Sequence, residues 1–142
     1  MGMYAPKGRR EVYLLCFDGR QRIGLVRHAG NSLDLPTAAC APQESYREAV
    51  CRLVDGAAAL RFGGVVARLD VSHHGAAAHR KVRLFTAHAE RSCSASWLWM
   101  PWRQAVRRLP SLGTSELAEF VEGYLEGWIP DGWITLTSDL RR

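Results

Sequence analysis

Ionisable side chains that could carry out acid–base or metal chemistry gather in one segment, which contains Glu44, Glu48, Arg52 and Asp55. Carboxylates can act as general acids and bases, and together with substrate phosphates they can hold Mg²⁺. Successive residues of an α-helix are about 100° apart, so a helix would place all four side chains within about 80° of one another. The same spacing fits a solvated helix face, on which Glu48 pairs with Arg52 at i, i+4 and Glu44 braces the preceding loop.

A predicted loop holds a second group of titratable side chains, His73, His74 and His79, around Gly75. Histidine titrates near neutral pH, so this group could contact a metal or a phosphate, or act as an acid–base pair. No carboxylate accompanies these histidines at the spacing of metal ligands. A polar surface loop is therefore the alternative interpretation.

Arginine and tryptophan supply further candidates for ligand binding. Arg22 and Arg27 lie on a predicted strand, and arginine suits bidentate contact with phosphate. Trp97, Trp99 and Trp102 could stack on a nucleobase, although packing in a core or an interface is the commoner role of such side chains.

Hydrophobic periodicity and turn signals predict the elements that would position these side chains. Ser45 and Glu48 form a capping box that opens a helix, on which Leu53 should face inward beside Tyr46 and Ala49. The order of elements predicts one mixed α/β (α+β) domain over residues 11–142, preceded by a flexible N-terminal arm over 1–10. Strands are expected over 11–17, 22–27, 64–71, 81–87 and 96–100, and further helices over 102–109 and from Thr114 or Ser115 to Leu125.

The overall composition is that of an ordinary folded domain. Of the 142 residues, 47% are hydrophobic and 23% are charged. No apolar run approaches the roughly 20 residues that cross a bilayer. The first residues lack the apolar segment of a secretory signal, and the four cysteines are widely spaced. We therefore expect a cytoplasmic protein with no membrane partner.

The formal net charge of +5 is unevenly distributed along the chain. Residues 1–110 carry 17 Lys and Arg against 8 Asp and Glu, whereas residues 111–142 carry 2 against 6. This distribution fits a polyanionic ligand, but a simple bias towards arginine fits it as well. Nucleic acid is not an expected partner, because no basic helix appears. Trp128 and Trp133 in the turn-rich tail are candidate anchors of a homodimer.

Residues 33–60 resemble the Nudix box, the signature G-x5-E-x7-R-E-U-x-E-E-x-G-U of the Nudix hydrolases, in which U is aliphatic. With Ala38 at the first glycine, Glu44 falls on the first glutamate and Arg52 on the arginine. The segment 97–102 is similar to the stretch of Trp and Pro that precedes a later helix in this family. The resemblance implies a Nudix-like α/β/α sandwich with a central mixed sheet.

The segment departs from the box at the positions that carry the family's chemistry. Leu53, Gly56 and Ala57 stand where the family has glutamates that bind Mg²⁺ or Mn²⁺, and Ala38 and Ala59 replace the signature glycines. Magnesium requires oxygen ligands, and these side chains supply none. We therefore expect no metal and no other cofactor, and no conventional Mg²⁺-dependent hydrolysis of a nucleoside diphosphate.

The first functional hypothesis is a degenerate Nudix domain that still binds a nucleotide or another diphosphate, as a sensor or a pathway accessory. Its candidate ligand contacts are Arg22, Arg27, Glu48, His73, His74 and Trp102.

Two alternatives remain open. One is a divergent hydrolase or isomerase that acts on a nucleoside diphosphate-linked substrate through residues outside the box, such as Asp70, His73 or Glu90, with Mg²⁺ or Mn²⁺. The other is a protein-interaction module.

Overall fold

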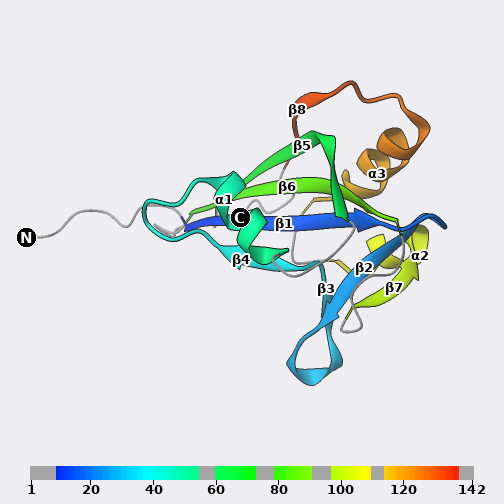
Figure 1. Ribbon diagram of the computed structural model, residues 1–142, viewed down its shortest axis with the longest axis horizontal. Coiled ribbons are helices and arrows are strands. Elements are labelled where there is room, and N and C mark those ends of the chain that lie inside the picture. The colour runs from blue at the N-terminus through cyan, green and yellow to red at the C-terminus, as the bar shows by residue number, and fades with distance from the viewer. Residues whose placement is uncertain (1–8, 55–59, 73–78, 91–96, 110–113, 138–142) are drawn as a thin grey trace, which may run out of the picture.

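A mixed eight-stranded sheet is the central element of the protein, seen in a computed structural model that describes residues 9–54, 60–72, 79–90, 97–109 and 114–137 (Figure 1). Its strands are β1 (Arg9–Phe17), β2 (Arg22–Arg27), β3 (Leu33–Asp34), β4 (Thr37–Ala39), β5 (Leu60–Ser72), β6 (His79–Ala89), β7 (Leu98–Pro101) and β8 (Gly132–Thr135). The main strand order is β3-β2-β1-β6-β5-β8, with β4 paired to β1 and β7 paired to β2. The strand β1 runs antiparallel to β2 and β4 and parallel to β6.

The sequence of β1 accounts for its internal place in the sheet. The last seven residues of RREVYLLCF are all buried, as expected for a strand that is covered on both faces. Successive side chains of a strand point to opposite faces. Tyr13 and Leu15 therefore enter one hydrophobic core, and Val12 and Leu14 enter the other.

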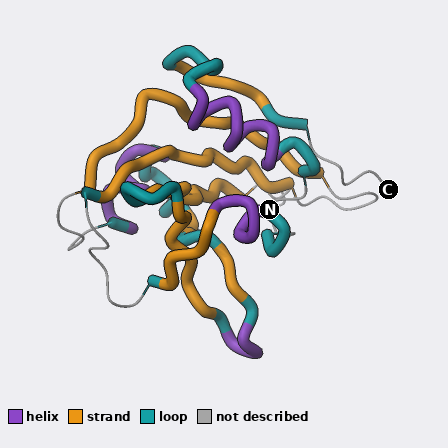
Figure 2. Tube along the Cα trace, turned by 90° about the vertical axis from the view of Figure 1, so that its right-hand side faces the viewer, coloured by secondary structure: helices purple, strands orange, loops and turns teal. Residues whose placement is uncertain are grey.

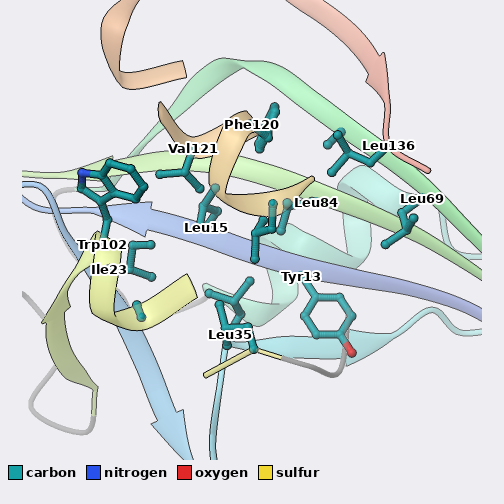
Figure 3. Close-up of a cluster of buried hydrophobic side chains, with 14 of the residues drawn as sticks. Tyr13, Leu15, Ile23, Leu35, Leu69, Leu84, Trp102, Phe120, Val121 and Leu136 are labelled. Carbon is teal, nitrogen blue, oxygen red and sulfur yellow. The ribbon is translucent and has the colours of Figure 1, made fainter. Parts of the chain in front are cut away.

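Helices cover both faces of the sheet. The helix α1 (Tyr46–Leu53) packs through Ala49 and Val50 on the face of Val12 and Leu14, and we call this cluster the α1 core. The helices α2 (Trp102–Val106) and α3 (Leu117–Glu126) pack on the opposite face and form the α3 core, whose labelled members in Figure 3 include Trp102, Phe120, Val121, Leu15 and Leu84. The hairpin of β2 and β3, with the short 3-10 turn η1 (Ala29–Asn31) at its tip, projects from this body (Figure 2).

The expected capping box opens α1. Ser45 Oγ accepts the N–H of Glu48 at 3.0 Å, and Glu48 Oε1 accepts the N–H of Ser45 at 2.8 Å. Leu53 packs against the α1 core as expected, together with Tyr46 and Ala49, but it is only partly buried.

The later helices are shorter than the sequence predicts. The helix α2 ends at Val106 rather than 109, and α3 begins at Leu117 with Glu116 as its N-cap residue, rather than at Thr114 or Ser115. Thr114 Oγ1 accepts the N–H of Glu116 at 3.1 Å, so it stabilises the turn before the helix. Gly127 ends α3 in the left-handed conformation (φ 82°), as expected. No helix within the described ranges is long and apolar enough to cross a membrane.

All five expected strands are present, and β5 and β6 extend beyond the predicted ranges. The strand β7 begins at Leu98 and ends at Pro101 rather than at 100, and β1 begins at Arg9, within the predicted N-terminal arm. The sequence analysis missed β3, β4 and β8, because strands of two to four residues are too short to show an alternating pattern. The strand β8 forms from the aromatic tail and pairs parallel with β5. Trp128 and Trp133 in this tail are 69% and 64% exposed.

The partial burial of Leu53 predicts a graded response to truncation. Leu14→Ala, at a fully buried position of the same core, should lower the free energy of unfolding by about 2–5 kcal/mol. Leu53→Ala should cost about half as much, because only part of the side chain leaves water on folding. Urea unfolding of both variants measures the difference. Equal costs would contradict the packing of α1 described above.

Candidate functional site

A fork of hydrogen bonds from Arg52 holds the loop between β4 and α1. Arg52 Nε and Nη2 donate to the two carboxylate oxygens of Glu44 at 2.9 and 2.8 Å. Arg52 Nη2 also donates to the carbonyl of Ala39 at 2.9 Å. Glu44 Oε1 accepts, in addition, the N–H of Ala41 at 2.9 Å. The helix is thereby tied to the start and to the end of the loop.

Arg10 of β1 fixes the same loop from the other side. Its Nη2 donates to the carbonyls of Glu44 and Ala41 at 2.7 and 3.0 Å, and its own carbonyl accepts the N–H of Cys40 at 2.8 Å. The guanidinium of Arg10 also lies 5.2 Å from the centre of the Tyr46 ring. The loop is therefore positioned by β1 and α1 together.

The prediction that Glu48 forms an ion pair with Arg52 is wrong. The Glu48 carboxylate is engaged by the N–H of Ser45 in the capping box, and Arg52 binds Glu44 instead. A glutamate three residues after the N-cap has a backbone donor at hand, which competes with a partner one turn later. The expectation that Glu44 braces the loop is confirmed.

These contacts keep both charges of the fork in place. Hydrogen bonds from Arg52 and from the N–H of Ala41 lower the pKa of Glu44 from its ordinary 4.5 to about 2. The same bond to Glu44 raises the pKa of Arg52. The fork is therefore fully charged at neutral pH.

The resemblance to the Nudix box implies a divalent metal on α1, but the described side chains do not fit one. Leu53 packs against the apolar α1 core, and positions 56 and 57 lie outside the described residues. Among the side chains that the structure describes, no three His, Cys, Asp or Glu residues lie close enough to bind a metal ion. Mg²⁺ and Mn²⁺ need oxygen ligands, which Leu53 does not provide.

A cavity of about 260 Å³ opens beside β4, and we call it the β4 cavity. Its volume is slightly below the roughly 300–1,000 Å³ of a site that encloses a drug-sized ligand. It is therefore suited to one end of a larger molecule. Arg9, Glu11, Tyr13, Thr37, Ala38, Ala39 and Arg80 line it.

A partly buried ion pair between Arg80 and Glu11 lines the β4 cavity. Arg80 Nε and Nη2 donate to Glu11 Oε1 at 3.1 and 2.9 Å, and Nη2 also donates to the hydroxyl oxygen of Tyr13 at 2.8 Å. Glu11 is only 5% exposed. Arg9 donates to the other carboxylate oxygen of Glu11 and is 71% exposed itself. The parallel pairing of β1 with β6 brings these residues together, although Glu11 and Arg80 are 69 positions apart.

The protonation states of the cavity follow from burial and from this pairing. Burial opposes the charge on Arg80, but the hydrogen bonds to Glu11 and Tyr13 outweigh it, and the pKa of Arg80 is raised. Burial also raises the pKa of Tyr13, so its hydroxyl is neutral at pH 7. Two arginines share one carboxylate here, and Arg9 reaches solvent. The cavity is therefore suited to an anionic group.

Three of the predicted ligand contacts have different surroundings in the structure. Arg22 donates through Nε to Asp18 Oδ2 at 2.7 Å and stabilises the turn between β1 and β2. Arg27 is exposed on the projecting hairpin, opposite Leu33. Trp102 is buried in the α3 core.

Of the other predicted contacts, Glu48 lies within the described part of the chain. Glu48 is exposed and caps α1. His73 and His74 lie outside the described residues, and β6 begins at His79. Among the predicted site residues that the structure describes, Glu44 and Arg52 are in direct contact, whereas Trp102 belongs to the α3 core.

Sequence reasoning missed Glu11, Tyr13 and Arg80 as lining residues. The available signal was a glutamate at the start of an otherwise apolar segment, because a buried carboxylate must find a partner. The identity of that partner could not be read from the sequence, since it depends on which strand lies beside β1.

Comparison with known proteins identifies the fold. No protein-family model matches the chain, and no curated protein matches its sequence. Solved structures do match. An Ap4A hydrolase of C. elegans is 12% identical with a TM-score of 0.64, covering 87% of this chain and 100% of its own. The Nudix hydrolase RenU of M. smegmatis is 17% identical with a TM-score of 0.59, covering 90% of each chain.

A further match is the NUDIX domain of NrtR from Shewanella oneidensis, solved with ADP ribose. It is 15% identical with a TM-score of 0.55, covering 87% of this chain and 90% of its own. At such identities the likeness concerns the fold alone. The chain has the Nudix fold, which confirms the mixed sheet between helices that the resemblance implied.

The low pKa of Glu44 predicts how the stability of the protein depends on pH. A carboxylate whose pKa is lower in the folded state stabilises that state above its unfolded pKa and loses this effect as the pH falls. The contribution of Glu44 should therefore be complete above pH 4.5 and disappear as the pH falls towards about 2. Glu44→Gln should lower the stability at pH 7 and flatten its pH dependence in this window.

Glu122→Gln is the matched control, because Glu122 is exposed on α3. Urea unfolding of both variants between pH 2 and pH 7 gives the two pH profiles. Identical profiles for the two variants would show that the fork adds no stability.

Proposed function

We propose that this protein binds a nucleotide or a related diphosphate without hydrolysing it through a metal ion, and that it acts as a sensor or an accessory of a pathway. Three observations support the proposal: the Nudix fold, the intact fork between Glu44 and Arg52, and the apolar environment of Leu53.

The position of Leu53 is the observation that carries the proposal. At this position the family has a metal-binding glutamate, which neutralises phosphate charge together with Mg²⁺. A metal in such a site provides several kcal/mol of transition-state stabilisation. A leucine that packs against the α1 core provides no ligand, so the described part of the box favours binding over hydrolysis.

The β4 cavity is the best candidate for the ligand's diphosphate. Ala38 and Ala39 of the box-like segment line it, and the fork holds the carbonyl of Ala39 in place. Arg9 and Arg80 place two positive charges beside the one carboxylate of Glu11, and Arg9 is exposed enough to contact a phosphate. The volume of about 260 Å³ leaves the rest of a nucleotide outside this cavity.

ADP ribose, which the NUDIX domain of NrtR binds, is a suitable first probe. With EDTA present and the ligand at 100 times its Kd, binding should stabilise the protein by about 2.7 kcal/mol. This corresponds to about 5–10 °C in Tm for a domain of this size. Thermal denaturation measures the shift, and AMP, which lacks the diphosphate, should give a smaller one.

Arg9→Gln tests the role of the cavity without removing the buried partner of Glu11. It should weaken ADP ribose binding about tenfold, because one charge-assisted contact is lost. Arg107→Gln makes the same charge change at the exposed C-cap residue of α2, and it should leave the affinity unchanged. No stabilisation by any diphosphate would contradict the proposal. Metal-dependent release of products would favour the divergent hydrolase instead.

A further inference from the structure

A second cavity lies on the opposite face of the sheet from the β4 cavity and encloses about 380 Å³. This volume falls within the range of roughly 300–1,000 Å³ that is typical of small-molecule sites. Its lining residues come from the start of α1, from β5 and β6, and from the edge strand β8. We call it the β8 cavity; its lining residues are Tyr46, Arg47, Gly63, Gly64, Val66, Phe85, Gly132 and Trp133.

Arginines lie on the aromatic rings around the β8 cavity. The guanidinium carbon of Arg47 is 5.3 Å from the ring centre of Phe62 and 5.6 Å from that of Phe85. These distances are typical of cation–π contacts, in which the guanidinium keeps its N–H groups available to an anion. The cavity therefore combines flat apolar surfaces with a fixed positive charge.

A second arginine, Arg83, contacts the rings of Tyr46 and Trp133, which also line the cavity. The guanidinium carbon of Arg83 is 4.5 Å from the ring centre of Tyr46 and 5.9 Å from that of Trp133. Arg83 is buried, and its Nη1 donates to Asp70 Oδ1 at 3.1 Å. Arg83 thus positions the two rings, while Asp70 balances its charge.

The charge of Arg47 is not balanced in the same way. Arg47 is exposed, and within the described part of the chain no carboxylate lies within ion-pair distance of it. The carboxylate of Asp131 lies at the rim, close against Gly64, where a Cβ would be 2.4 Å from its carboxyl carbon. The Asp131 carboxylate would repel a second negative group. The cavity is therefore suited to a ligand with a single anionic group, placed beside Arg47.

Trp133 provides an exposed flat surface at the edge of the sheet. Its side chain is 64% exposed, and it lies on β8 opposite Val66 of β5. A cationic ligand is disfavoured at this ring, because Arg83 already lies near it and would repel a second cation. A neutral or anionic aromatic ring can stack on the indole.

We propose that the β8 cavity binds a small planar aromatic anion, with its ring on Trp133 and its carboxylate or phosphate at Arg47. The site is independent of the proposed function, because it shares no lining residue with the β4 cavity and faces the other side of the sheet. A ligand bound here would contact the first turn of α1, which follows the loop held by the fork.

NMR titration of the full chain tests this proposal through the indole N–H signal of Trp133, which Trp133→Phe identifies. Phenyl phosphate and benzoate are the probes, because they carry the same ring on a phosphate or a carboxylate. At least one of them should shift this signal in a saturable manner, and the tighter of the two identifies the preferred anion. Benzyl alcohol and inorganic phosphate should each bind at least tenfold more weakly, because each lacks one half of the ligand.

Variants separate the two contacts. Arg47→Gln should weaken the tighter probe about tenfold, since a hydrogen bond to a charged group is lost. Arg103→Gln is the matched control, because Arg103 also lies on a tryptophan, 4.6 Å from the ring centre of Trp102, but outside the cavity. Trp128→Phe identifies the indole signal of the other exposed tryptophan, so that the two signals can be told apart.

The proposal is overturned by any of three results. Neither probe shifts the Trp133 signal in a saturable manner, or benzyl alcohol or inorganic phosphate binds as tightly as the aromatic anions, or Arg47→Gln and Arg103→Gln have equal effects. Arg47 is exposed, so its substitution should leave the protein folded, and the dispersion of the NMR spectrum checks this directly.

Discussion

The fork from Arg52 to Glu44 and Ala39 is the interaction on which the arrangement of the candidate site depends. It connects α1 on one face of the sheet with β4, whose residues line a cavity associated with the other face. Arg10 adds the contact to β1, so the loop is held at both ends and in its middle. The β4 cavity therefore has a rigid wall, and the arginine opposite, Arg80, is fixed by its own bonds to Glu11 and Tyr13.

The two ends of α1 differ in a way that bears on function. Its start is polar, with the capping box of Ser45 and Glu48, whereas Leu53 at its end packs against the α1 core. Charged groups that bind a metal must lie in a cleft that is open to solvent. A leucine in this place instead stabilises the folded state by leaving water. The contacts of the fork do not involve the side chain of residue 53. They can therefore hold the loop of the Nudix fold in place whether that residue is a glutamate or a leucine.

Local features could be predicted from the sequence, and features that join distant segments could not. The capping box at Ser45, the bracing role of Glu44 and the end of α3 at Gly127 depend on neighbours within a few residues. The pairing of Glu11 with Arg80 depends on the parallel register of β1 and β6. The ion pair expected for Arg52 was wrong because two carboxylates competed for it, and spacing alone does not rank such competitors.

A calorimetric titration of Mn²⁺ into the protein tests the central claim, that the fold retains the brace of the box without its metal site. The apolar packing of Leu53 predicts weak heats that do not saturate, since α1 lacks a set of oxygen ligands among its described residues. One saturable site of millimolar or tighter affinity, with Mn²⁺ broadening the NMR signals of α1, would contradict this claim. In that case the residues outside the described ranges would have to supply the ligands.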